Sequence, residues 1–113
     1  MTVLTPLSPA EVSARIRSGQ AVLVDIRETG EVAQERIAEA IVTPLSAFEA
    51  CELDVQPGRE VIFMCRSGAR TGSNCDRLAA RIPGPAFVLD GGLNAWKAQG
   101  LPTVTGAPAR GTA

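Results

Sequence analysis

One segment of the sequence combines a nucleophile, two cations and two hydroxyl groups: Cys65, Arg66, Ser67, Gly68, Ala69, Arg70 and Thr71. An apolar run over residues 61–64 precedes it and indicates a buried strand, and a helical pattern follows it. Small side chains and a glycine let successive backbone N–H groups turn toward one point, where they can bind an anion. The start of the following helix and the two positive charges favour an anion at the same point. We therefore expect Cys65 to be a thiolate with a pKa below that of a free cysteine.

The composition restricts how this cysteine can be activated. The sequence has three cysteines and no histidine, which excludes Ser-His-Asp triads, Cys-His pairs and zinc sites with histidine ligands. Backbone amides, a helix terminus and arginines must then activate the thiol. A cysteine after an apolar strand can also be a small buried hydrophobe. Arg66 and Arg70 argue against that alternative, because an apolar core does not accommodate two nearby guanidinium groups.

Other residues invite a chemical interpretation with less support. Asp25 and Arg27 end another predicted strand and are candidates for a supporting role. Such charged residues commonly pair with other chain segments to fix loops, and we favour this structural interpretation over a catalytic one. Cys75 would lie about 15 Å from Cys65 along a continuous helix, too far for a disulfide. Cys51 is expected to be exposed and could be a resolving thiol, with only its presence to support that.

Length and composition are typical of a globular domain. The 113 residues predict one domain, with 45% hydrophobic residues, 20% charged residues and a net charge of −1. The near-neutral charge and the 4% aromatic content argue against nucleic acid as a partner. The chain has neither an apolar run of membrane-spanning length nor a signal-peptide pattern after Met1. Together with the thiols, this favours a reducing, cytoplasmic setting.

The apolar pattern alternates between short strands and helices. Strands are expected over residues 21–26, 40–42, 60–64 and 86–89, and helices over 9–18, 28–38, 45–50, 70–82 and 93–99. This alternation predicts an α/β fold with a central parallel sheet of about five strands and helices on both faces. Ligands bind such sheets at the carboxyl ends of the strands. Residues 1–102 form the expected domain, and residues 103–113 are expected to be a loose tail.

Four blocks of the sequence match a known pattern in the right order. They are Val24-Asp25-Ile26-Arg27 with Glu31, then Ala40-Ile41-Val42-Thr43-Pro44-Leu45, then residues 65–71, then Leu89-Asp90-Gly91-Gly92-Leu93-Asn94-Ala95-Trp96 with Gly100-Leu101-Pro102. They resemble the rhodanese-like sulfurtransferases, in which the third block is the active-site loop. The chain departs from that pattern at Arg36, which stands where the family usually has a structural histidine.

The resemblance implies a three-layer rhodanese-like fold and a persulfide mechanism. The Cys65 thiolate would attack the outer sulfur of thiosulfate or a similar donor, release sulfite and keep the sulfur as a persulfide cradled by the amides of residues 66–71. Cyanide or a cellular thiol would then accept this sulfur. The resemblance also implies that Arg66 meets the incoming anion, that Ser67 offers a hydroxyl donor, and that Arg70 either binds the anion or pins the loop. It implies no metal or organic cofactor, and we expect a monomer or a weak dimer.

Two other functions stay open on the sequence alone. In phosphatases and arsenate reductases of related fold, a longer segment separates the cysteine from its arginine than the four residues between Cys65 and Arg70. A non-enzymatic interaction or sulfur-carrier module is the second alternative, although such modules tend to lack the cysteine. Rhodanese domains of similar layout also precede a membrane hairpin. The chain is thus expected to be either a complete protein or a domain of a membrane-tethered one, without membrane contact of its own.

Overall fold

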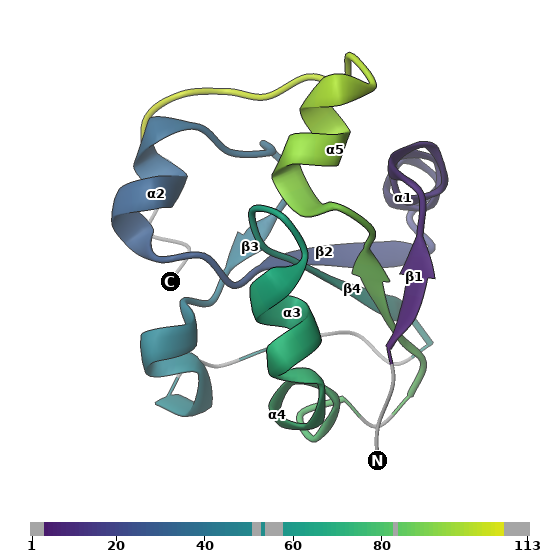
Figure 1. The fold of residues 1–113 in the computed structure, drawn as a ribbon. Coiled ribbons are helices and arrows are strands. Elements are labelled where there is room, and N and C mark those ends of the chain that lie inside the picture. Colours follow the sequence, from purple (N-terminus) through teal and green to yellow (C-terminus); the bar gives the residue numbers. More distant parts are fainter. Residues whose placement is uncertain (1–3, 51–52, 54–57, 83, 108–113) are drawn as a thin grey trace.

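Five strands of the described residues, which are 4–50, 53, 58–82 and 84–107, form one sheet in the computed structural model (Figure 1). The strands are β1 (Thr5–Leu7), β2 (Ala21–Asp25), β3 (Ile41–Val42), β4 (Glu60–Met64) and β5 (Ala86–Leu89). Their order is β1-β5-β4-β2-β3, and every neighbouring pair is parallel, which confirms the predicted parallel sheet. The apolar pattern missed β1, because this strand is three residues long and has Pro6 at its centre.

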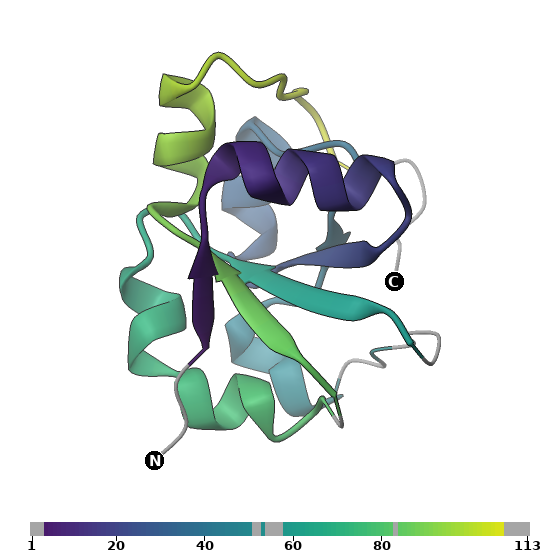
Figure 2. The same cartoon turned by 90° about the vertical axis from the view of Figure 1, so that its right-hand side faces the viewer.

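Helices cover both faces of the sheet, as the alternating pattern predicts (Figure 2). On one face lie α1 (Pro9–Arg17) and α5 (Gly92–Ala98), and on the other lie α3 (Ala69–Ser73), α4 (Cys75–Ala79) and the 3₁₀-helix η1 (Leu45–Ala50). α5 lies between α1 and α2 (Thr29–Gln34) in Figure 1. None of the helices in the described part of the chain has the length and hydropathy of a membrane span.

The central strand β4 contributes side chains to both layers of the core. Ile62 and Met64 pack with α1 and α5, whereas Val61, Phe63 and Cys65 pack with η1 and α4. All five residues are at most 1% exposed. Successive side chains of a strand point to opposite faces of the sheet. The alternation therefore directs the side chain of Cys65 to the face that α3 and α4 cover.

The start of α1 is the one that the sequence predicts. Ser8 Oγ accepts a hydrogen bond from the Glu11 N–H at 3.1 Å, and the Glu11 carboxylate accepts one from the Ser8 N–H at 3.0 Å. This reciprocal pair satisfies two N–H groups that a helix start would otherwise leave unpaired. The first helical residue is Pro9, whose missing N–H costs nothing there.

The helix predicted over residues 28–38 is shorter than expected, because a distant segment pairs with its second half. α2 ends at Gln34, and Arg36 forms an isolated antiparallel bridge with Val104, with N–H···O distances of 2.9 and 2.8 Å. The N–H of Gly106 also donates to the carbonyl of Ala33 at 2.8 Å. Residues 103–107 of the expected loose tail are thus attached to the domain, and residues 108–113 lie outside the described residues. Arg36, the residue in the usual histidine position, helps to hold this segment through a bond from Nε to the Gly106 carbonyl.

The single helix predicted over residues 70–82 is interrupted at Asn74, where φ is −122°. The Asn74 side-chain amide donates to the carbonyl of Arg70 at 2.8 Å. In a continuous α-helix, that carbonyl would accept the backbone N–H of Asn74 instead. The backbone N–H of Asn74 bonds to Thr71 O, one residue closer, and the chain restarts as α4. Side-chain competition for backbone acceptors thus divides the helix.

Candidate active site

Cys65 lies at the carboxyl end of β4, at the centre of the sheet. The end of β2 is beside it, since Asp25 is in register with Met64. Gly68 has a φ of 101°, a left-handed conformation that glycine adopts without strain, and α3 begins directly after it. The loop therefore leaves the strand, reverses and enters a helix within four residues of the thiol. This is the strand-to-helix position at which the sequence places the nucleophile.

Cys65 is 0% exposed, and hydrogen-bond donors of the loop lie close to its sulfur. The N–H of Gly68 points at Sγ from 3.1 Å, and the Thr71 hydroxyl lies 3.8 Å from Sγ. Burial raises the pKa of the Cys65 thiol, but hydrogen bonds outweigh this effect and the pKa lies below its ordinary value. The bonds come from the backbone N–H groups of Thr71, Gly68 and Arg70 and from the Thr71 side chain. A sulfur anion at this position thus faces an array of N–H dipoles.

The two hydroxyl groups of the loop have different surroundings. Thr71 is buried, and its hydroxyl donates to the carbonyl of Gly68 at 3.0 Å, which closes the turn that carries the N–H donors. Ser67 is exposed, and its hydroxyl accepts a weak bond from the N–H of Ala69 at 3.4 Å. The Ser67 hydroxyl hydrogen is thus left to donate to a ligand above the loop.

The start of α5 packs against the backbone of the loop at Cys65 and Arg66. Leu93 N–H donates to Cys65 O at 2.9 Å, and Asn94 N–H donates to Arg66 O at 3.0 Å. Gly92 makes this approach possible, because a β-carbon there would lie 2.5 Å from Cys65 O and 2.6 Å from Arg66 O. In the sequence, Gly91 and Gly92 stand out only as part of the fourth matched block, which indicates no contact with the Cys65 loop. The paired glycines after a predicted strand are the signal that could have indicated a close backbone contact.

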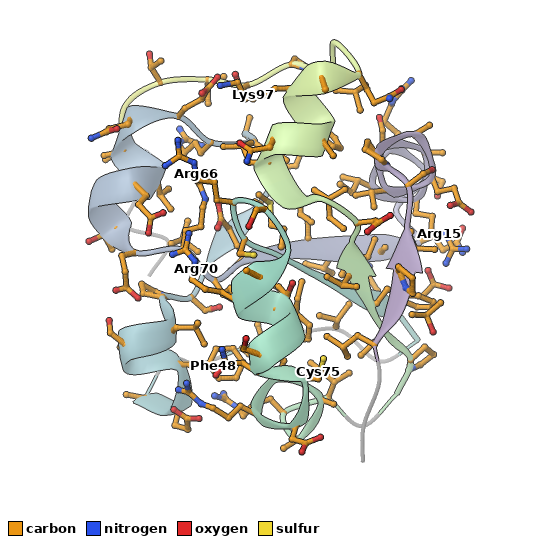
Figure 3. All side chains as sticks on the ribbon, viewed as in Figure 1. Arg15, Phe48, Arg66, Arg70, Cys75 and Lys97 are labelled. Atoms are coloured by element: carbon orange, nitrogen blue, oxygen red, sulfur yellow. The ribbon has the colours of Figure 1, made fainter. Side chains whose placement is uncertain are left out.

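The two arginines of the loop have different partners, although both extend toward α2 (Figure 3). Arg70 makes a bidentate ion pair with Glu31, with distances of 2.7 and 2.8 Å. Arg66 is exposed, and no side chain of the described residues forms a hydrogen bond or ion pair with it. The guanidinium of Arg66 is thus the loop cation that can receive an anionic ligand. Arg70 has the geometry of a residue that pins the loop.

Asp25 and Arg27 form a buried ion pair with each other, at 0% and 3% exposure. The Arg27 Nε lies 3.1 and 3.2 Å from the two Asp25 oxygens, and Nη2 lies 2.8 Å from Oδ2. Arg27 Nη2 also donates to the carbonyl of Glu35 at 2.8 Å, which connects the pair to the segment after α2. The sequence favours a structural role for these residues through pairing with other chain segments. In the structure they pair mainly with each other, and only the Glu35 carbonyl connects them to another segment.

A polar cleft of about 250 Å³ borders the loop between α2 and α5. Its lining residues are Arg27, Glu31, Gln34, Glu35, Arg66, Leu93, Asn94 and Lys97. Lys97 and Glu35, which both line the cleft, form an ion pair at 2.7 Å. Figure 3 shows Lys97 and Arg66 on the same side of the molecule. The cleft thus offers charged and amide groups next to Arg66, the residue that follows Cys65.

Cys75, the other cysteine among the described residues, has no part in the N–H array. Cys75 begins α4, and its Sγ lies 3.3 Å from Thr71 O and 3.4 Å from Gly72 O, the geometry of a thiol that donates to helix carbonyls. Cys75 and Cys65 are both free thiols. Cys51 lies outside the described residues, so its expected exposure stays a prediction.

A parallel sheet with a buried cysteine in the loop at the end of its central strand defines a class of α/β domains with a loop cysteine. The chain belongs within this class to the rhodanese-like domain family, which matches residues 8–99. The matched region runs from the cap of α1 through the end of α5. It contains every strand but β1, and it contains the whole of the Cys65 loop.

Individual relatives agree with this assignment. A protein named sulfurtransferase from Allochromatium vinosum is 38% identical over 82 residues, which are 73% of this chain and 77% of that protein. An uncharacterized protein from Synechocystis is 33% identical over 98 residues, 87% of this chain and 55% of that protein. The crystal structure of thiosulfate sulfurtransferase from Pseudomonas aeruginosa has a TM-score of 0.79 and 27% identity over 93% of this chain. This chain spans only 21% of that enzyme.

Proposed function

We propose that this domain is a thiosulfate sulfurtransferase that carries the transferred sulfur as a persulfide on Cys65. The observation that carries the proposal is the position of the Gly68 N–H and the Thr71 hydroxyl at 3.1 and 3.8 Å from the Cys65 sulfur, in a loop whose hydrogen bonds lower the pKa of this thiol. Family membership and relatives named sulfurtransferase support sulfur transfer as the general activity. The donor, the acceptor and the persulfide intermediate are the finer parts of this proposal.

In the first step, the Cys65 thiolate attacks the outer sulfur of thiosulfate. A new sulfur–sulfur bond forms to Cys65, the bond between the two sulfurs of thiosulfate breaks, and its electron pair leaves with sulfite. The cysteine thereby becomes the persulfide Cys65-S-S⁻, and no proton is needed. The negative charge moves from the original sulfur to the added one. We expect the loop donors, which lie against the Cys65 sulfur, to stabilise the thiolate before the attack and the persulfide anion after it.

In the second step, a thiophilic acceptor removes the outer sulfur. Cyanide attacks the terminal sulfur of the persulfide, thiocyanate leaves, and the Cys65 thiolate is regenerated. A thiolate acceptor takes the same sulfur as its own persulfide. The two half-reactions share one site and one covalent intermediate, so the kinetics are ping-pong.

Arg66 is the residue that we assign to donor binding. Its side chain is exposed at the cleft that borders the loop, and no described side chain neutralises it. Thiosulfate carries two negative charges, and a guanidinium is a good partner for its sulfonate oxygens. Asp25 and Arg27 are assigned a supporting role, because their pair fixes the end of β2 beside Met64 and the start of the loop.

The orientation of Arg70 favours sulfur transfer over phosphate or arsenate chemistry. A phosphatase of this loop type needs its loop arginine directed at the oxyanion. Here the guanidinium of Arg70 is bound to Glu31 at 2.7 and 2.8 Å. The retained Cys65, with its array of N–H donors, also argues against a domain that acts only by binding a partner.

Thiocyanate formation from thiosulfate and cyanide tests this proposal. We expect turnover by the wild-type protein, none by Cys65→Ser, and full turnover by Cys75→Ser as a matched control. Hydrolysis of an aryl phosphate is measured in parallel with the same three proteins. Phosphate release by wild type without thiocyanate formation would contradict the proposal.

A further inference from the structure

The ion pair between Arg70 and Glu31 joins the Cys65 loop to a distant part of the chain. Both nitrogens at the end of Arg70 bond to the Glu31 carboxylate, and the two residues are 39 positions apart. Arg70 is the second residue of α3, whereas Glu31 lies in α2, which follows a different strand. Nothing local in the sequence requires these two residues to meet.

Glu31 is itself held at a fixed position. Its Oε2 accepts the N–H of Glu28 at 3.1 Å within the capping arrangement of α2. The Glu28 carboxylate in turn accepts the N–H and the hydroxyl of Ser46 in η1, at 3.1 and 2.6 Å. Two carboxylates thus connect the segments that follow β2, β3 and β4. Arg70 is bound to an anchor that several contacts keep in place.

The short helix α3 needs such an anchor. It has five residues, and isolated helices of that length are not stable in water. Its N-cap, Gly68, provides no side-chain hydrogen bond. The turn that begins α3 nevertheless brings the Gly68 N–H to 3.1 Å and the Thr71 hydroxyl to 3.8 Å from the Cys65 sulfur, and hydrogen bonds from Arg70 and Thr71 help to lower the pKa of this thiol. A shift of this turn would move these donors away from the sulfur.

We propose that Glu31 is a positioning residue that acts through Arg70 to hold the first turn of α3 where its N–H groups stabilise the anionic sulfur on Cys65. The proposal deepens the proposed function and rests on it, since Cys65 is taken as the reacting group. If Glu31 acted on Cys65 only through its charge, removing that charge would change the pKa of Cys65 in the opposite direction. Its negative charge opposes a nearby thiolate and neutralises Arg70, so its removal alone would favour the thiolate.

The charged groups around the thiol come from the loop, from α3, from the end of β2 and from α2. They are Arg66 in the loop, Arg70 in α3, the Asp25–Arg27 pair at the end of β2, and Glu31 in α2. Glu31→Gln changes one of these charges and leaves the others in place. The sign of the resulting change in the Cys65 pKa therefore separates positioning from direct charge effects.

The test is the pH dependence of Cys65 alkylation by iodoacetamide, a neutral reagent, with peptide mass analysis to separate Cys65 from Cys51 and Cys75. We expect Glu31→Gln to raise the pKa of Cys65 by about one, which slows alkylation about tenfold below the wild-type pKa. The matched control is Glu49→Gln. Glu49 makes an equally short bidentate pair with Arg77 at 2.7 and 2.8 Å, between η1 and α4. This control should leave the pKa of Cys65 unchanged.

Two further variants keep the test decisive. Arg70→Gln should raise the pKa of Cys65 at least as much as Glu31→Gln, because it also removes a positive charge near the thiol, and the double variant Glu31→Gln/Arg70→Gln should raise it no further than Arg70→Gln alone. Glu31→Asp keeps the negative charge but shortens the side chain by one methylene group. This variant should fold and should raise the pKa of Cys65 less than Glu31→Gln does. A lowered or unchanged pKa in Glu31→Gln, or additive effects in the double variant, would overturn the proposal. Alkylation requires no sulfur transfer, so these results stand even where the protein fails to use thiosulfate.

Discussion

Gly92 at the start of α5 lies directly against the backbone of Cys65 at the end of β4. A β-carbon on Gly92 would lie 2.5 Å from the carbonyl oxygen of Cys65, closer than such contacts ever occur. The atoms that this β-carbon would meet belong to the backbone of Cys65 and Arg66, so no flexible side chain can move aside to relieve the overlap. The N–H of Leu93 donates to the same Cys65 carbonyl at 2.9 Å. Two consecutive residues of α5 thus fix the position of Cys65, the proposed sulfur carrier.

Gly92→Ala is expected to destabilise the domain by about 2 kcal/mol or more, because it adds a backbone overlap to an unfavourable positive φ of 60°. Urea-induced unfolding followed by circular dichroism measures this change. The matched control is Gly30→Ala in α2, where a β-carbon meets nothing within 4 Å. That control should be neutral or slightly stabilising, since alanine favours helices. Equal stability of Gly92→Ala and wild type would show that the loop tolerates displacement.

Arg66→Ala is expected to raise the KM for thiosulfate about tenfold, because one charge-assisted contact to the donor is lost. Initial rates over a range of thiosulfate concentrations give this value. Alkylation of Cys65 by neutral iodoacetamide should change little, because Arg66 makes no described side-chain contact within the loop. If both rates fell equally, Arg66 would be holding the loop rather than the donor.

Asp25→Asn is expected to cost about 3 kcal/mol of stability, because it leaves the buried Arg27 guanidinium without its counter-charge. The double variant Asp25→Leu/Arg27→Met removes both charges and should recover most of that loss. Thermal and urea unfolding of the two variants and wild type make the comparison. A double variant that is no more stable than Asp25→Asn would argue against the buried pair as the origin of the cost.

The reactivity of Cys65 should extend to lower pH than that of an ordinary cysteine. Hydrogen bonds to the sulfur outweigh burial and hold the pKa of Cys65 below its usual value, so the thiolate survives as the pH falls. Alkylation rates of native protein should therefore reach half their maximum at a lower pH than those of the same protein unfolded in urea.

The same shift has a consequence for stability. Because the folded-state pKa is below the unfolded one, the thiolate contributes stability above the unfolded pKa, and this contribution is lost as the pH falls through the folded pKa. The stability of wild type relative to Cys65→Ala should thus increase with pH across that interval. A difference that decreases with pH would mean that burial dominates over the hydrogen bonds.

Local patterns of the sequence were sufficient to predict most of the fold. The apolar run before Cys65 predicts β4, and the Ser8–Glu11 spacing predicts the start of α1. Both signals depend on residues within one turn or one strand of each other, which is where sequence patterns are informative. The loop at the end of the central strand follows from the same local reasoning and the geometry of parallel sheets.

The contacts that the sequence could not predict join segments that are far apart. The Arg36–Val104 bridge ends α2 early, and the Arg70–Glu31 pair favours a structural role for Arg70 over anion binding. The fit of Gly92 against Cys65 likewise depends on how α5 meets β4. Tertiary contacts of this kind override local propensity. An arginine or a glycine can serve several roles, and the sequence alone does not show which of them its distant partners select.

The central claim is that Cys65 carries the transferred sulfur, and intact-protein mass spectrometry under non-reducing conditions tests it most directly. After incubation with thiosulfate and removal of the excess, wild type and Cys75→Ser should each gain the mass of one sulfur atom, which cyanide then removes. Cys65→Ser should gain nothing. A wild-type protein that takes up no sulfur, or a Cys65→Ser variant that still does, would contradict the assignment of Cys65 as the sulfur carrier.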